Sequence, residues 1–106
     1  MTDSEPPACG CRYSRADAVK IFKIACSARG SVRQTDHAKN RLAQYNATME
    51  DVIRLVKKGQ ILREPEQHIK SGAWLHRIED ATNEGIRAAE FEIMSETSIR
   101  LVTVIK

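Results

Sequence analysis

Residues 34–59, QTDHAKNRLAQYNATMEDVIRLVKKG, decide the fold because they contain the start and stop signals of two consecutive helices. The first helix is expected over residues 36–45, with Asp36 as its N-cap. Its buried face is marked by apolar residues at the i, i+4 and i+7 spacing of an α-helix: Ala38, Leu42 and Tyr45.

The second helix is expected over residues 48–58. Thr48 and Asp51, three residues apart, form a variant of the capping box at its start. Two lysines in the last turn complement the negative end of the helix dipole, and Gly59 is expected to end the helix in the left-handed conformation. The residues expected to face the core are Met49, Val52, Ile53 and Val56.

The rest of the chain places an earlier helix over residues 14–28, ended at Gly30, and then a link or brief strand over residues 31–35. After the last helix, alternating apolar residues predict strands, with a polar loop over residues 66–72. These strands are expected at 60–64, 74–79, 86–94 and 98–105. Helices followed by strands predict an α+β domain, in which two to three N-terminal helices pack on a mostly antiparallel sheet of about four strands.

Length and composition favour a single domain over residues 13–106 behind a flexible tail at residues 1–12. The chain has 106 residues, of which 42% are hydrophobic and 29% charged, values that are ordinary for a globular protein. No apolar run approaches the roughly 20 residues of a membrane span, and the start of the chain is acidic and polar, unlike a signal peptide. We therefore expect a cytoplasmic protein that has no contact with membranes.

The cysteines do not predict a metal centre. Cys9 and Cys11 stand in a C-x-C pattern, and no second Cys/His pair follows at the spacing of a zinc site. Three cysteines, an odd number, also make no disulfide framework. The sequence therefore predicts neither a bound metal nor another cofactor.

Charge is unevenly distributed although the net charge is only +3. Residues 12–41 carry eight basic and two acidic residues, whereas residues 79–96 carry one basic and six acidic residues. A basic face attracts a polyanion such as RNA, and an acidic face suits a basic protein or a second copy of the chain in a homodimer. The alternative is that both runs are solvated faces of helices and strands.

Three groups of residues in the opening stretch form a pattern: His37-Ala38-x-x-Arg41, Thr48-x-x-Asp51-Val52 and Gly59. This pattern resembles the opening of a family of small uncharacterised bacterial domains grouped with the RelE-type ribonuclease toxins. The resemblance covers residues 34–63, beyond which only the order of predicted strands agrees. It implies a RelE-like fold, RNA as the substrate, an antitoxin as protein partner, and a toxin–antitoxin pair or mobile element as the context. It also implies an acid or base near the end of the chain, where this sequence offers only Arg100 and Lys106.

Cleavage of RNA through its 2′-hydroxyl needs a base, an acid, and cations for the charge that builds on phosphate. His37 and His76 are the candidate acid and base, and Arg41 and Arg77 the candidate catalytic cations. His37 and Arg41 stand four apart on the predicted helix and so share one side of it. Further RNA-binding residues are expected at Arg33, Lys39, Arg87 and Arg100.

Three of the candidates also have a structural interpretation. His37 can form a local hydrogen bond at the helix start, and His76 can pack in the core beside Trp74. Arg41 can bridge to Asp36 or to a carboxylate on a strand. Three functions therefore stay open: a metal-independent, toxin-like endoribonuclease, a catalytically silent relative that binds RNA or protein, and an unrelated phage or plasmid accessory protein, for instance an inhibitor of a host nucleic-acid-targeting complex.

Overall fold

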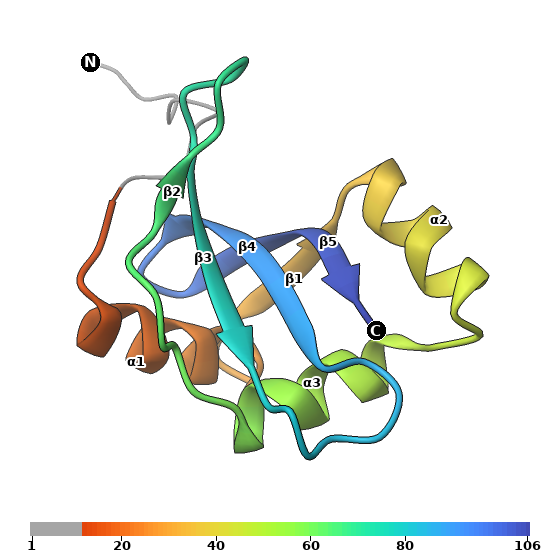
Figure 1. Cartoon of the computed structure of the whole chain (residues 1–106). Helices are drawn as coiled ribbons and strands as arrows, with labels where there is room; N and C mark the ends of the chain where they lie inside the picture. The colour runs from red at the N-terminus through yellow and green to blue at the C-terminus, as the bar shows by residue number, and fades with distance from the viewer. Residues whose placement is uncertain (1–11) are drawn as a thin grey trace.

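The computed structural model describes residues 12–106, so the expected tail and the Cys9–Cys11 pair lie outside the described residues except for Arg12. Three helices and five strands follow one another along the chain (Figure 1). They are α1 (Arg15–Ala25), β1 (Ser31–Gln34), α2 (Asp36–Gln44), α3 (Met49–Lys58), β2 (Glu66–Gln67), β3 (Trp74–Glu79), β4 (Ala88–Ser95) and β5 (Ser98–Ile105).

The strands form one sheet in the order β1-β5-β4-β3-β2, in which β1 and β5 are parallel and all other neighbours antiparallel. Figure 1 shows α1 and α3 on one side of this sheet and α2 beside the C-terminal end of β5. The expected α+β class is confirmed, with one strand more than expected because residues 31–34 pair with β5. Within residues 12–106 no helix is long and apolar enough to cross a membrane.

The core lies between the helices and the inward face of β3, β4 and β5. At its centre the ring of Phe22 on α1 meets that of Phe91 on β4 edge to face, with centroids 4.8 Å apart. Helix α3 adds Val52, Leu55 and Val56, all fully buried. The fully or almost fully buried apolar residues that the strands contribute to the core are Ile78, Ala89, Phe91, Ile93, Ile99, Leu101 and Val104.

Two irregularities in the pairing of β4 with β5 keep the apolar residues of both strands on the same face. Met94 and Val102 have no partner across the ladder, so each strand contains one extra residue. The two shifts cancel. The strand ends far from the tight turn, where Ala88 pairs with Ile105, are therefore in the same register as Ser95 and Ser98 beside the turn. The resulting partners are Ser95↔Ser98, Ile93↔Ile99, Phe91↔Leu101, Glu90↔Thr103 and Ala89↔Val104.

The opposite side of the sheet, which we call the polar face, carries the outward residues of β1, β3, β4 and β5. Their cross-strand partners follow directly from the register. The residues of the polar face used below are Arg33, Arg77, Glu79, Glu90, Glu92, Arg100 and Thr103.

The start of α2 differs from the expectation, because Thr35 and not Asp36 is its N-cap. The Thr35 hydroxyl accepts a hydrogen bond from the Ala38 N–H at 3.1 Å and donates one to the Val102 carbonyl at 3.2 Å. A hydroxyl can do both, whereas a carboxylate only accepts. Thr35 therefore caps the helix and fastens its first turn to β5.

The end of α3 also differs, since Gly59 is extended, with φ −79° and ψ 173°, and not left-handed. A glycine is needed there for space: a Cβ would lie 2.7 Å from the Leu55 carbonyl oxygen and 2.9 Å from Cγ1 of Ile78. The start matches the prediction, because the Thr48 N–H donates to the Asp51 carboxylate at 2.8 Å. The buried face differs by one position: Leu55 is fully buried, whereas Ile53 is half-buried.

Three other boundaries move. Helix α1 ends at Ala25, before the expected residue 28. The chain turns after it, and the Ser31 N–H then donates to the Thr97 carbonyl in the β4–β5 turn. The predicted strand over 60–64 reduces to a single bridge between Gln60 and Glu79, and the two residues of β2 pair instead within the predicted polar loop. The strand predicted over 86–94 runs over 88–95, while the 74–79 and 98–105 strands are confirmed.

Val52→Asp tests the burial of α3. The substitution would place an unpaired charge at a position with no exposed surface and should cost several kcal/mol, a large part of a typical stability of about 5–15 kcal/mol. Glu50→Ala, exposed on the same helix, is the matched control and should stay within about 0.5 kcal/mol. Urea denaturation of both variants measures the difference, and equal midpoints would contradict the packing.

Candidate functional site

A row of four polar side chains crosses the polar face, formed by His37 at the start of α2, Thr103 on β5, Glu90 on β4 and Arg77 on β3. The Nε2 atom of His37 lies 3.3 Å from Oγ1 of Thr103, within hydrogen-bonding distance. Thr103 stands opposite Glu90, and Glu90 opposite Arg77. Because neighbouring strands are about 4.8 Å apart, the three strand residues stand side by side.

The position of His37 follows from the cap of α2. The Thr35 N–H donates to the Leu101 carbonyl at 3.0 Å, and the Thr35 hydroxyl binds the next carbonyl of β5. These two hydrogen bonds hold the first turn of α2 against β5. The imidazole of His37, two residues later, is thereby brought to Thr103.

Arg77 is held between two carboxylates by long contacts. Its Nη1 lies 3.9 Å from Oε2 of Glu90, and its Nε lies 3.8 Å from Oε2 of Glu79. Glu79 is bound more tightly by Arg63, whose Nε donates to the same oxygen at 3.0 Å. The Nε of Arg77 is buried and forms no hydrogen bond within residues 12–106. The guanidinium of Arg77 therefore still has hydrogen-bonding capacity for an anion.

Arg100, a predicted RNA-binding residue, is engaged by a carboxylate. Its Nε donates to Oε1 of Glu92 at 2.9 Å, and Glu92 is only 6% exposed. Arg33 stands next to Arg100 in the register of β1 and β5, is exposed, and has no ion pair within the described chain. Arg33 is thus the more accessible of the two cations on this side of the polar face.

Arg41 lies on α2 with its guanidinium carbon 5.4 Å from the centre of the Tyr45 ring. The ion pair with Asp36 or with a strand carboxylate is not formed within residues 12–106. Its Nε is buried and has no hydrogen-bond partner within residues 12–106, whereas most buried polar atoms in proteins have one. Arg41 and His37 lie on the same side of α2, but the structure gives no direct contact between their side chains.

His76 lies on the opposite face of β3 from Arg77 and is 1% exposed. Its Nε2 accepts the N–H of Tyr13 at 3.1 Å, and the Tyr13 ring lies 6.2 Å away between centroids. Burial lowers the pKa of His76, because the charged imidazolium is disfavoured away from water. The sheet therefore separates His76 from the row, and its position fits the core interpretation.

Lys39 and Arg87 are both exposed, and no contact given by the structure joins either of them to the row. Glu90 and Thr103 do belong to the row but are not among the candidates that the sequence singles out. Alternation along the strands could have placed both on the outward face. Their pairing follows the register of the turn that pairs Ser95 with Ser98, because the two bulges cancel, and the sequence has no Asn-Gly signature that fixes this register.

The described part of the chain offers no cluster of three or more His, Cys, Asp or Glu side chains that could hold a metal ion. The acid–base groups of the row, an imidazole and a carboxylate, can transfer protons without one. Comparison with known proteins adds no assignment: no family model matches the chain, and neither a curated protein sequence nor a solved structure is significantly similar to it.

The buried state of His76 predicts a pH-dependent stability. The pKa of His76 is lowered in the folded protein. Below the ordinary histidine pKa of about 6.5, the unfolded chain therefore binds a proton more readily than the folded protein does. The contribution of His76 is therefore fully present above about pH 6.5 and is lost as pH falls through the folded-state pKa. Urea denaturation at about pH 7.5 and about pH 5.5 measures this loss, which His76→Gln should reduce.

His68→Gln is the control for that experiment, since His68 is exposed in the loop after β2. This variant should keep the pH dependence of the parent protein. An unchanged pH dependence in His76→Gln would mean that other groups govern the acid response.

Proposed function

We propose that the polar face binds RNA and that His37 and Glu90 cleave it by proton transfer without a metal ion. The observation that carries this proposal is the placement of both groups against Thr103. His37 reaches its hydroxyl at 3.3 Å, and Glu90 stands directly opposite it across the ladder. An acid and a base on either side of one residue can act on the two oxygens of a single phosphodiester.

In the proposed reaction, the Glu90 carboxylate takes the proton of the ribose 2′-hydroxyl, and the 2′-oxygen attacks phosphorus. The bond from phosphorus to the 5′-oxygen breaks, and protonated His37 donates its proton to that leaving oxygen. The products are a 2′,3′-cyclic phosphate and a 5′-hydroxyl, with both protein groups in exchanged protonation states. Proton exchange with water then restores them.

Arg77 is proposed to bind the phosphate. Its contacts with Glu79 and Glu90 are long, at 3.8 and 3.9 Å, so a phosphate oxygen could replace them with shorter bidentate hydrogen bonds. As Arg77 moves to the phosphate, Glu90 is released to act as the base. Arg41, with its unpartnered Nε, is the proposed second cation on the α2 side.

The resemblance of residues 34–63 to a family grouped with RelE-type ribonuclease toxins supports the same function. The resemblance also implies an acid or base near the end of the chain, where none of residues 91–106 is a Tyr, Gln or His. Glu90 supplies a proton-transfer group on the sheet in its place. RNA as substrate, and a toxin–antitoxin or mobile-element context, belong to this proposal.

A second candidate, binding without catalysis, is favoured by the pairing of charges on the polar face. Arg100 with Glu92, and Arg77 with Glu90, are ion pairs between neighbouring strands that help to hold the sheet together. In that case the protein acts on a protein partner, as an accessory inhibitor would. Incubation of the purified protein with total RNA distinguishes the two, because the second candidate predicts no cleavage.

His37→Ala and Glu90→Gln test the acid and the base. Each should reduce the rate of RNA cleavage by about 10²- to 10⁴-fold, the usual contribution of a positioned acid or base. The melting temperature should change little, since His37 is exposed and Gln keeps the shape of Glu90. His68→Ala is the control, because His68 is exposed in the loop after β2 and does not belong to the row. This variant should keep full activity. Cleavage at the parental rate in both site variants would exclude the assignment.

The salt dependence of RNA binding tests the cations independently of cleavage. Affinity should fall steeply with salt, and Arg33→Ala should reduce the slope of log affinity against log salt by about one unit. Lys70→Ala, exposed in the loop between β2 and β3, should leave the slope unchanged. Fluorescence anisotropy of a labelled single-stranded RNA gives both slopes, and binding that ignores salt would contradict a phosphate contact at Arg33.

A further inference from the structure

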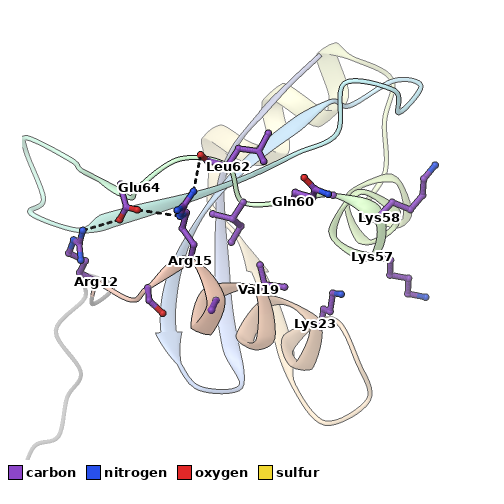
Figure 2. Close-up of a pocket in the computed structure, with 13 residues that line it drawn as sticks. Arg12, Arg15, Val19, Lys23, Lys57, Lys58, Gln60, Leu62 and Glu64 are labelled. Carbon is purple, nitrogen blue, oxygen red and sulfur yellow. Dashed lines mark hydrogen bonds and ion pairs between the residues drawn. The ribbon is translucent and has the colours of Figure 1, made fainter.

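A groove of about 850 Å³ lies in the helix layer, bounded by α1, the end of α3 and the segment at residues 59–64 (Figure 2). Its volume is in the range of ligand and peptide sites. None of the four residues of the proposed catalytic row lines it. The groove is therefore a separate feature of the molecule.

The groove is strongly basic. Its lining includes five cations and a single carboxylate, Glu64. Figure 2 shows Arg12 and Arg15 both turned toward Glu64, each with a nitrogen 3.2 Å from a carboxylate oxygen. The other three cations have no ion pair within residues 12–106: Lys23, Lys57 and Lys58.

Apolar side chains lie between these cations. Leu62 is 58% exposed, and Val19 on α1 is half-buried. Lys23 and Lys57 also line an adjoining hollow of about 400 Å³ that includes Val56. The combined surface thus follows the seam between α1 and α3, where Val19 and Leu62 offer accessible apolar surface beside the lysines, whereas Val56 is fully buried.

This combination fits an acidic peptide better than a nucleic acid. Single-stranded nucleic acids are bound by cations together with aromatic side chains on which bases stack, and the groove lining contains no aromatic residue. A phosphate backbone would also leave Leu62 and Val19 without apolar contacts. An amphipathic peptide offers apolar side chains for the strip and carboxylates for the lysines at the same time.

We propose that the α1–α3 groove binds an acidic amphipathic segment of a protein partner. Carboxylates of the segment pair with Lys23 and Lys57, and its apolar residues cover Val19 and Leu62. The inference is independent of the proposed catalytic function, because the row on the polar face and this groove share no residue.

The test uses a fluorescein-labelled peptide of about 15 residues, four helical turns, with Leu and Glu arranged to form one apolar and one acidic side. Its binding to the full chain is measured by fluorescence anisotropy. We expect saturable binding that Lys23→Glu with Lys57→Glu weakens at least about tenfold, and that Leu62→Ser also weakens. The matched control is Lys20→Glu with Lys70→Glu, two exposed lysines outside the groove, which should bind within about twofold of the parent.

A scrambled peptide and a competing RNA provide two further tests of the proposal. A peptide of the same composition in scrambled order should bind more weakly, because it lacks the apolar side. Equal binding would mean that the groove is a non-specific basic surface. An unlabelled single-stranded RNA should not displace the peptide. Displacement by RNA, equal loss in the control variant, or no saturable peptide binding would each overturn the inference.

Discussion

The pairing of β4 with β5 is the constraint on which the rest of the structure depends. Its two bulges, at Met94 and Val102, cancel one another. Between them, Phe91 faces Leu101, and the inward side chains meet α1 through the contact of Phe91 with Phe22. Without the bulges a one-residue shift would turn the apolar set of one strand toward water. The same register brings outward polar residues together on the other face, so one ladder builds both the core and the candidate site.

Strand β5 is also the element to which the N-terminal half is attached. It pairs with β1 along one edge, and where β1 ends, Thr35 continues the attachment through hydrogen bonds to the carbonyls of Leu101 and Val102. Helix α2 begins there, so its first turn cannot move independently of the sheet. His37 follows the last residue of β1 by three positions, and this attachment brings its side chain onto the polar face beside Thr103.

Charged residues that are grouped along the chain are not grouped in the same way in the folded structure. The basic segment 12–41 is divided: Arg12, Arg15 and Lys23 line the helix-layer groove, whereas Arg33 lies on the polar face. In the acidic segment 79–96, three of the six carboxylates pair with arginines of the sheet or of the segment before it. These groups are Glu79, Glu90 and Glu92. The order of charges along the chain therefore does not give their arrangement on the surface.

Local signals in the sequence by themselves determined the helices, the capping box at Thr48 and the strands at 74–79 and 98–105, because each depends on neighbours within about one helical turn or on alternation along one strand. They also placed His37 and Arg77 among the candidates. Only the tertiary structure decided the cap at Thr35, the extended Gly59, the burial of His76 and the partnership of Glu90 with Thr103. Each of these depends on contact with another element of the fold, and neither local spacing nor residue type specifies which element that is.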